Sequence, residues 1–285
     1  MRVLVTGGAG RLGSEVVRLI ASRGDSAVAF DLPQAYWGAV RGVPGVEALP
    51  GDVTDKRQVS EAIGGADAVI HLAALLPPRS EANRELTMRV NVEGTSNIVE
   101  SLGKTGAPLV FASSIATYGV SAKDQTPIRE SHRLQAHDLY SESKIEAERL
   151  LGDSGVDQVT LRIAPIAVAD LVELPETVPY RGDQRVEHIY VEDAAAALFS
   201  ALDDGRASGG TFNIAGGPTW QMTGAEYIER FYDALGVEVE PNFSKCYTAV
   251  DWYDTSRGIF LGYQRLTFNG FLEKLRVMGE QLGLR

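Results

Sequence analysis

The chain has 285 residues, 44% of them hydrophobic and 23% charged, which excludes a disordered, collagen-like or coiled-coil protein. Acidic residues outnumber basic ones by 38 to 27, and the basic residues form no run, so neither nucleic acid nor an anionic membrane is an expected partner. The single Cys246 excludes an internal disulfide.

No stretch reaches the roughly 18 apolar residues that a membrane helix needs. The apolar run within Met1 to Gly7 is too short for a signal peptide and leads directly into glycines, so a cytoplasmic protein is expected. The four histidines and the single cysteine lack metal-ligand spacing, so no metal site is expected.

Short β-branched runs alternate with helical patterns through the first two thirds of the chain, which predicts an α/β fold with a doubly wound parallel sheet. The expected strands lie near Arg2 to Thr6, Ala27 to Asp31, Val46 to Leu49, Ala68 to Leu72, Leu109 to Ser113, Gln158 to Ile163 and Phe212 to Ala215. The expected helices lie near Arg11 to Arg23, Thr54 onward, Glu85 to Lys104, Val191 to Leu202, Thr223 to Leu235 and Thr267 to Leu282.

The regular alternation stops after Ile163, where proline-containing segments mark loops. We expect residues 1–163 to form the main domain, completed by parts of 186–215. Residues 164–185 and 216–285 are expected to form a small substrate-binding cap that is not an independent folding unit.

A glycine-rich loop follows the first expected strand, with Gly7, Gly10 and Gly13 spaced three apart and a helix starting at once. Such glycines allow a tight turn, a close approach of the backbone to a pyrophosphate and close packing of helix on strand, while the helix N-terminus faces the negative charge. The pattern predicts a Rossmann-like dinucleotide site that begins with this loop.

Two aspartates follow later strands. Asp31 ends the second strand, where a carboxylate accepts hydrogen bonds from the adenosine ribose and repels a 2′-phosphate, which favours NAD over NADP. The next residue is Leu32, so no basic side chain is placed there for an extra phosphate. Asp52 follows the third strand and either contacts the adenine amino group or caps the helix that begins near Thr54.

Tyr140 and Lys144 are four residues apart in an expected helix, so they lie on one face. They complete an ordered set of motifs that includes the glycine loop, His71 to Ala74 at a strand end, Asn91 in a helix, and Ser113 and Ser114 at another strand end. The segments Ser113 to Gly119, His188 to Ala194 and Phe212 to Gly216 agree with it. This succession resembles the extended short-chain dehydrogenase/reductase superfamily, in its NAD-dependent epimerase/dehydratase branch, over nearly the whole chain.

The resemblance implies that Tyr140 is the proton acceptor for a substrate hydroxyl, that Lys144 is the neighbouring cation that also holds the nicotinamide ribose, and that Ser114 hydrogen-bonds the substrate oxygen. Asn91 is expected to fix a helix and a backbone contact rather than to act in catalysis. Pattern and resemblance together place the NAD contacts at Gly7, Gly10, Arg11, Leu12, Gly13, Asp31, Asp52, Val53, Leu72, Ala73, Ala74, Asn91, Tyr140 and Lys144.

Three functions are compatible with these residues. The short segment between Pro165 and Tyr190 favours an NAD-dependent oxidoreductase that acts on a secondary alcohol or ketone of a small, sugar-derived substrate. A 4-epimerase of a nucleotide sugar stays open, although Arg181, Arg185 and Arg257 would have to replace the arginine pair that usually binds the diphosphate. A non-catalytic dinucleotide-binding protein is the third alternative. A dehydratase needs an additional acid and base to eliminate water. Ile115 and Ala116, which follow Ser114, cannot transfer protons, and this disfavours a dehydratase.

The resemblance also implies a homodimer, built from the helices around Asn91 and Tyr140. Leu86, Val90, Ile145 and Leu150 are apolar residues on these helices that could serve such an interface or the core.

Overall fold

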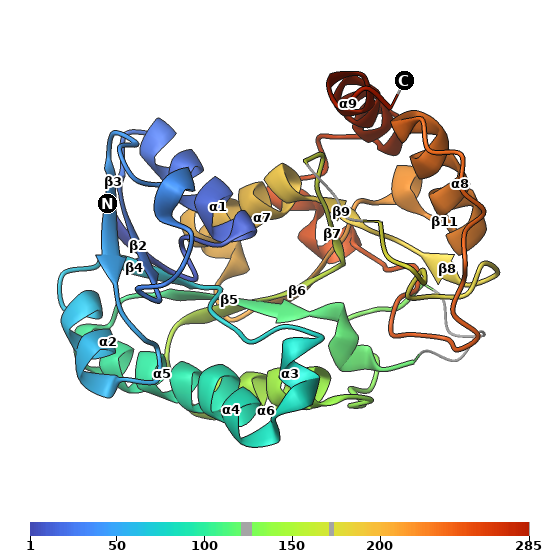
Figure 1. The fold of residues 1–285 in the computed structure, drawn as a ribbon. Helices are drawn as coiled ribbons and strands as arrows, with labels where there is room; N and C mark the ends of the chain where they lie inside the picture. The colour runs from blue at the N-terminus through green and yellow to red at the C-terminus, as the bar shows by residue number, and fades with distance from the viewer. Residues whose placement is uncertain (121–126, 171–173, 285) are drawn as a thin grey trace.

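The computed structural model describes residues 1–120, 127–170 and 174–284 (Figure 1). Its centre is a seven-stranded parallel sheet with the strand order β10-β6-β5-β4-β1-β2-β3. The order reverses between β1 and β4, which creates the crevice where doubly wound sheets bind ligands. The strands are β1 Arg2–Thr6, β2 Ser26–Asp31, β3 Val46–Pro50, β4 Ala68–His71, β5 Leu109–Ser114, β6 Gln158–Ile163 and β10 Thr211–Ile214.

Helices cover both faces of the sheet, which is why the central strands are buried on both sides and read as continuous apolar runs (Figure 1). One face is covered by α1 Arg11–Ser22 and α7 Val191–Asp203. The other is covered by α2 Lys56–Ile63, α5 Gly94–Thr105 and α6 Leu139–Asp153.

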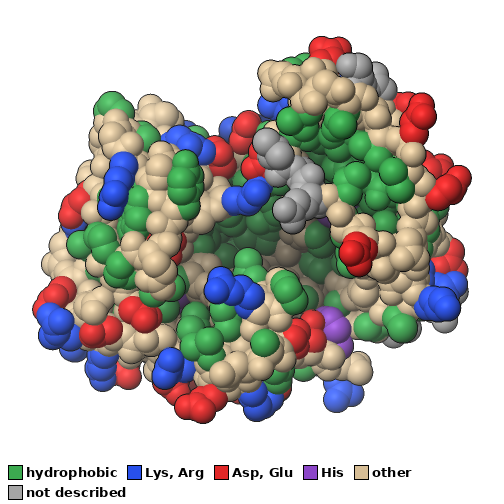
Figure 2. Space-filling view, in the orientation of Figure 1, with side chains coloured by type: hydrophobic (Ala, Val, Ile, Leu, Met, Phe, Trp, Pro, Cys, Tyr) green, Lys and Arg blue, Asp and Glu red, His purple; other side chains and the backbone are tan. Residues whose placement is uncertain are grey.

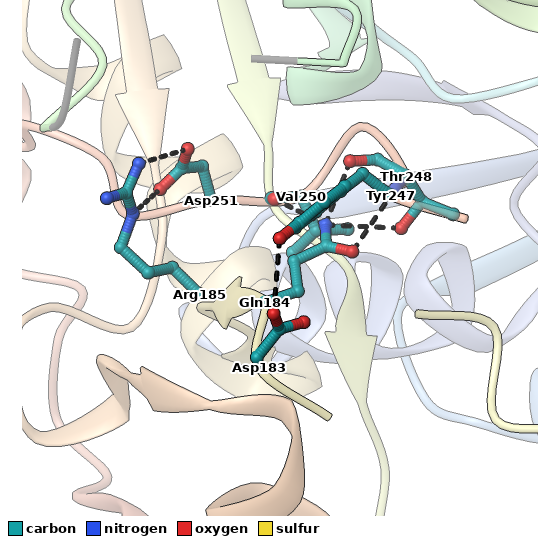
Figure 3. A pocket seen from close by; sticks show the side chains of 7 residues that line it. All are labelled: Asp183, Gln184, Arg185, Tyr247, Thr248, Val250 and Asp251. Atoms are coloured by element: carbon teal, nitrogen blue, oxygen red, sulfur yellow. Dashed lines mark hydrogen bonds and ion pairs between the residues drawn. The ribbon is translucent and has the colours of Figure 1, made fainter. Parts of the chain in front are cut away.

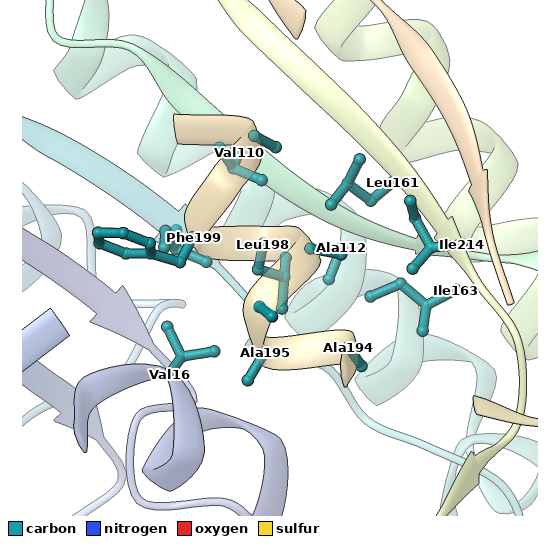
Figure 4. Packing of buried hydrophobic residues seen from close by; sticks show 14 of the residues in the cluster. Val16, Val110, Ala112, Leu161, Ile163, Ala194, Ala195, Leu198, Phe199 and Ile214 are labelled. Carbon is teal, nitrogen blue, oxygen red and sulfur yellow. The ribbon is translucent and has the colours of Figure 1, made fainter. Parts of the chain in front are cut away.

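The packing of α7 shows why this layer is tight. Its run of alanines, Ala194 to Ala197, is fully or almost fully buried, and Leu198 and Phe199 continue the apolar face (Figure 4). Small side chains let α7 approach both α1 and the sheet, so its backbone lies close to β4, β5 and β6.

The expected helix over residues 85–104 is not one regular α-helix. It comprises α4 Arg84–Met88, a π-helical turn η2 Arg89–Glu93 and α5, joined without a break. A π turn inserts one residue per turn and often marks a functional position. Asn91, which the sequence analysis assigned to the site, lies inside this π turn.

The cap holds a separate hydrophobic cluster, drawn from residues 167–191 and 220–278. Stacked aromatic rings, including Tyr227, Phe268 and Phe271, dominate this cluster. Its elements are β7 Ile166–Ala167, β8 Arg185–Val186, β9 Ile189–Tyr190, β11 Met222–Thr223, α8 Gly224–Leu235 and α9 Phe268–Gln281. The chain crosses between cap and sheet several times, because β10 and α7 lie between the cap's strands in sequence.

The sequence located the seven sheet strands and the helices α1, α7, α8 and α9 to within two residues. The helix expected from Thr54 begins at Lys56, because the side chain of Asp55 accepts hydrogen bonds from the amides of Arg57 and Gln58 and caps it. The cap's short strands β7, β8, β9 and β11 were not expected; they have two residues each, too few for a periodic pattern.

Gly13 tests the close contact between α1 and the loop. A Cβ at this position would lie 2.0 Å from the carbonyl oxygen of Gly7, so we expect Gly13→Ala to lower the free energy of unfolding by about 1–3 kcal/mol. Gly103→Ala is the matched control: it lies in α5 with open space around its Cβ, and it should raise stability by up to about 1 kcal/mol. Urea unfolding measures both, and equal effects of the two substitutions would contradict this packing.

Candidate active site

The glycine loop has the geometry of an anion cradle. Gly7 has φ +69°, and a Cβ there would meet the backbone of Ala73 at 3.0 Å. Gly10 caps α1 without any side-chain hydrogen bond, and the first turn of α1 carries no acidic residue. The helix N-terminus therefore keeps its amides and its positive dipole for a ligand, as a pyrophosphate requires. Arg11 and Leu12 begin the same helix, and Arg11 forms an ion pair with Asp170.

Gly8 is a member of the loop that the sequence analysis did not assign. A Cβ at Gly8 would lie 2.6 Å from the Cα of Ala29, because the loop runs directly over β2. Gly8 lies outside the three-residue spacing of Gly7, Gly10 and Gly13, so the sequence pattern did not indicate it.

Asp31 lies at the carboxyl end of β2, where the adenosine ribose was expected. Its Oδ2 accepts a hydrogen bond from the amide of Ala9 at 3.1 Å, and its Oδ1 accepts one from the amide of Leu32 at 2.8 Å. The carboxylate thus holds the glycine loop against the end of β2 and stays partly exposed.

Asp52 follows β3, and Val53 after it is buried. Asp52 does not cap α2, because that cap is Asp55. Its Oδ1 instead accepts a hydrogen bond from the amide of Thr54 at 2.8 Å, within the loop between β3 and α2.

A buried polar relay positions the segment Leu72 to Ala74 next to the loop. The Thr6 hydroxyl lies 2.6 Å from Nδ1 of His71 and accepts hydrogen bonds from the amides of Leu72 and Ala73, both at 3.2 Å. On its other side, Nε2 of His71 lies 3.0 Å from the hydroxyl of Thr95. Burial, followed by the charge of Lys144, lowers the pKa of His71 to about 3, so this imidazole is neutral and acts as a spacer between β1, β4 and α5.

Asn91 joins two parts of the site through its amide. Its Oδ1 accepts a hydrogen bond from the amide of Leu75 at 2.7 Å, and its Nδ2 donates to the Leu75 carbonyl at 3.1 Å and to the Ser143 hydroxyl at 2.8 Å. Asn91 thereby fixes the backbone after β4 against α6, which agrees with the positioning role implied by the resemblance.

The N-terminus of α6 has two acidic partners. Asp138 accepts a hydrogen bond from the amide of Ser141 at 2.7 Å and forms a capping box with it. Glu81, in the short helix α3 Arg79–Ala82, accepts hydrogen bonds from the amides of Leu139 and Tyr140 at 2.9 and 3.1 Å. Sequence reasoning missed Glu81, since no local spacing links it to residues nearly 60 positions later.

Ser114, Tyr140 and Lys144 come together at the carboxyl end of β5. The Ser114 hydroxyl lies close enough to the Tyr140 phenol to act on its pKa. The ammonium of Lys144 donates to the carbonyl of Ala112 at 2.7 Å and lies 5.9 Å from the centre of the Tyr140 ring. The three side chains lie on the sheet edge that also carries the glycine loop.

The electrostatics of this trio follow from burial. Burial raises the pKa of Tyr140 to about 12, although the hydrogen bond with Ser114 acts to lower it. Burial also lowers the pKa of Lys144 to about 8, against the opposing effect of Glu148. The chain's own groups alone therefore leave the Tyr140 phenol protonated at neutral pH.

Tyr118 is not the acid or base of this site. Its hydroxyl donates to Oδ1 of Asn213 at 2.5 Å and accepts a hydrogen bond from Arg162 at 3.0 Å, and its ring stacks on Tyr253. Burial raises the pKa of Tyr118 to about 12. Tyr118 is therefore a buried packing residue, held by Asn213, Arg162 and Tyr253.

The molecule is hollowed between the sheet and the cap, and hydrophobic side chains gather on the cap wall and the floor of this hollow (Figure 2). Three exposed apolar residues, Leu76, Val120 and Ile166, follow the carboxyl ends of β4, β5 and β6, which are adjacent in the sheet.

A polar pocket of about 120 Å³ lies within the cap (Figure 3). Arg185 donates to Asp251 through Nε at 2.6 Å and Nη2 at 3.1 Å, and Arg181 pairs with Asp183 at 2.7 Å. The third arginine of interest, Arg257, lies 5.7 Å from the centre of the Phe212 ring. The pocket is lined by Asp183, Gln184, Arg185, Tyr247, Thr248, Val250 and Asp251.

Two expected absences concern metals and membranes. Within residues 1–120, 127–170 and 174–284, no group of three His, Cys, Asp or Glu side chains has the arrangement of a metal site. No helix in this described part combines the length and the apolar character needed to cross a bilayer.

A doubly wound sheet with this loop and this Ser, Tyr and Lys trio is typical of proteins of the short-chain dehydrogenase/reductase type. Residues 3–166 match the model of the NAD dependent epimerase/dehydratase family, more than half of the chain. The protein belongs to this family, and NAD is the family's cofactor.

Curated relatives and solved structures agree with this assignment. The chain is 33% identical over 180 residues to 3 beta-hydroxysteroid dehydrogenase/Delta 5→4-isomerase of Mycobacterium tuberculosis, which is 59% of this chain and 47% of the relative. It is 37% identical over 149 residues to human 3 beta-hydroxysteroid dehydrogenase type 7, covering 46% of this chain and 39% of that one. The chain thus spans about half or less of the length of these relatives.

Among solved structures, UDP-glucose 4-epimerase of Thermotoga maritima with UDP-glucose has a TM-score of 0.86 at 21% identity, with 100% of both chains covered. A short-chain dehydrogenase/reductase superfamily protein of Agrobacterium tumefaciens with bound NAD has a TM-score of 0.83 at 24% identity, covering 99% of this chain and 98% of that one. These likenesses show the fold.

Asp31 provides a test of the ribose site. Because its carboxylate is expected to accept ribose hydrogen bonds and to repel a 2′-phosphate, Asp31→Asn should weaken NAD binding about tenfold and reduce the preference for NAD over NADP. Asp67→Asn is the control, since Asp67 also accepts a backbone hydrogen bond, from Arg2, but precedes β4 at the opposite end of the sheet. Titration calorimetry with both dinucleotides measures this, and unchanged selectivity in Asp31→Asn would remove Asp31 from the ribose site.

Proposed function

We propose that the protein is an NAD-dependent dehydrogenase that transfers hydride between NAD and a secondary alcohol or ketone of a small, uncharged, non-nucleotide substrate. The observation that carries this proposal is the position of the Lys144 ammonium, 5.9 Å from the centre of the Tyr140 ring and bonded to the Ala112 carbonyl of β5, the strand that ends in Ser114. A phenol held beside a second hydroxyl and a cation can exchange a proton with a substrate hydroxyl.

The residues of the first loop fit the cofactor. Gly7 and Gly13 stand where a Cβ would collide with backbone, and the uncapped N-terminus of α1 suits a pyrophosphate. We propose that Asp31 holds the adenosine ribose, that Asp52 and Val53 border the adenine, and that Leu72, Ala73 and Ala74 line the path toward the nicotinamide. Bound NAD supplies a hydride acceptor and, in its oxidised form, a positive charge.

The chain's own groups handle the proton. In alcohol oxidation, the substrate carbon loses a hydride, Tyr140 accepts the hydroxyl proton and the carbonyl bond forms. Ser114 donates a hydrogen bond to the substrate oxygen, where charge develops. Lys144 stabilises the phenolate electrostatically and holds the nicotinamide ribose, and Ala112 fixes the direction of its ammonium.

The charges of the cap argue against a nucleotide sugar. Arg185 and Arg181 already bind carboxylates of this chain, so a diphosphate in the cap pocket would also meet Asp183 and Asp251. Bringing like charges together is costly. The exposed apolar residues after β4, β5 and β6 suit a lipophilic substrate better. The related steroid dehydrogenases, which match 59% and 46% of this chain, favour a ring alcohol over the sugar-derived substrate expected from the sequence.

A substrate panel tests the proposal. The protein is incubated with NAD and 3β-hydroxysteroids, polyols, aldonates or nucleotide sugars, and NADH absorbance and products are followed. Stable accumulation of NADH with a ring alcohol supports the dehydrogenase. Inversion of a sugar without net NADH would replace it by an epimerase, and NAD binding without any conversion would favour a non-catalytic binding protein.

The pH dependence follows from Tyr140. Oxidation needs the phenolate and ketone reduction needs the phenol, and the pKa of Tyr140 in the protein alone is about 12. We expect kcat/KM for oxidation to rise with pH and that for reduction to fall over the same range, since the positive charge of oxidised NAD lowers this pKa into the accessible range.

Tyr140→Phe should reduce kcat about 10²- to 10⁴-fold without loss of NAD binding. Tyr118→Phe, as the neighbouring control, should leave the pH profile in place, and the reverse pattern would reassign the base.

We further propose a cytoplasmic homodimer. The interface implied by the resemblance would use α6 and the continuous helix made of α4, η2 and α5. Leu86 in α4, Val90 in η2 and Leu150 in α6 remain partly exposed, whereas Ile145 is buried within the chain. Light scattering at several concentrations measures the mass, and a monomer at all of them would exclude the dimer.

A further inference from the structure

The face of α6 that carries Tyr140 and Lys144 has a third ionisable residue, Glu148, which the proposed mechanism does not use. The three residues are spaced four apart, so they form one stripe along the helix. The Glu148 side chain is only 10% exposed, which is unusual for a carboxylate and requires partners.

Those partners come from the two strands beside α6. Arg162 on β6 donates to Glu148 through Nε at 3.0 Å and through Nη2 at 2.6 Å, and its side chain is only 8% exposed. Ser113 on β5 donates its hydroxyl to the same carboxylate. Ser113 directly precedes Ser114, so Glu148 holds the strand end that presents Ser114 to Tyr140.

Glu148 also acts on Lys144 through its charge. The ammonium is almost fully buried, with the Ala112 carbonyl at 2.7 Å and the Phe111 ring centre at 4.8 Å. Burial lowers the pKa of Lys144, and Glu148 opposes that shift. Among the ionisable side chains of the surrounding elements, Tyr140 on α6 and His71 on β4 interact with Lys144, and Arg162 on β6 lies beyond Glu148; β5 has none.

We propose that Glu148 is a positioning residue for the reaction: its buried carboxylate, clamped by Arg162, fixes the end of β5 through Ser113 and lies one helical turn from Lys144. This role rests on the proposed function, in which Lys144 acts as a cation. It makes the active-site stripe a set of three residues, with a base, a cation and a buried carboxylate on successive turns of one helix.

The protonation of Lys144 can be measured directly. The chain has six lysines, so NMR of protein labelled with ¹³C at lysine Cε gives few signals, and Lys144→Met identifies the relevant one. We expect Glu148→Gln to lower the pKa of Lys144 by about one unit or more, because a neighbouring negative charge is lost. Glu148→Asp should keep it near the wild-type value. The double variant Glu148→Gln/Arg162→Gln should fall between, because the unpaired guanidinium is removed as well.

Glu146→Gln is the matched control, because Glu146 lies on the exposed side of α6 and pairs with Arg149. It should leave the Lys144 titration unchanged. If Glu148→Gln does not fold, the neutral double variant and Glu148→Asp carry the comparison. Equal titration of Lys144 in the wild type and in the variants without a carboxylate would overturn the proposal.

Kinetics provide the second readout. In Glu148→Gln, the alkaline limit of kcat/KM should move to lower pH by the shift that NMR records, whereas a merely structural role predicts a loss of equal size at every pH. A shifted titration in a protein that converts no alcohol would support the role of Glu148 and reject the proposed dehydrogenase, so the two failures are distinguishable.

Discussion

The bond from the Lys144 ammonium to the Ala112 carbonyl is the constraint on which the site depends. It fixes α6 to the edge of β5 from within a buried environment, and it sets the distance between the helix that carries Tyr140 and the strand that ends in Ser114. A buried ammonium needs hydrogen bonds and a counter-charge. The neighbouring carbonyl and Glu148 supply them, so one lysine links the packing of the fold to its chemistry.

The proposed NAD-binding half of the site lies at the same end of the sheet, but it depends on backbone geometry rather than on a buried charge. There the backbone is the functional element: glycines remove Cβ atoms, α1 keeps its N-terminus uncapped, and Asp31 ties the loop to β2. The Thr6, His71 and Thr95 relay fixes the next strand end with neutral groups only. The two halves meet where β4 and β5 end, which is the position at which a dinucleotide would bring its reactive ring to Tyr140.

The sheet strands and the glycine loop were predictable, because local periodicity and spacing encode them. The pairing of Tyr140 with Lys144 was predictable for the same reason, since both lie on one helical face. The π turn around Asn91, the Glu81 contact with α6 and the Glu148 clamp were not, because each depends on residues distant in sequence. Asp55 rather than Asp52 caps α2, although both precede it closely, and only the backbone geometry distinguishes them.

In the proposed function the cap selects the substrate. Its residues Arg185 and Arg181 pair with Asp251 and Asp183 of the same chain, and this pairing is the reason why we propose a substrate without a diphosphate.

The most direct test of the account is a crystal structure of the protein with NAD. The account predicts the pyrophosphate at the N-terminus of α1 and C4 of the nicotinamide in contact distance of the Tyr140 hydroxyl, with Lys144 on the nicotinamide ribose. A dinucleotide bound elsewhere, or a nicotinamide ring turned away from Tyr140, would contradict it.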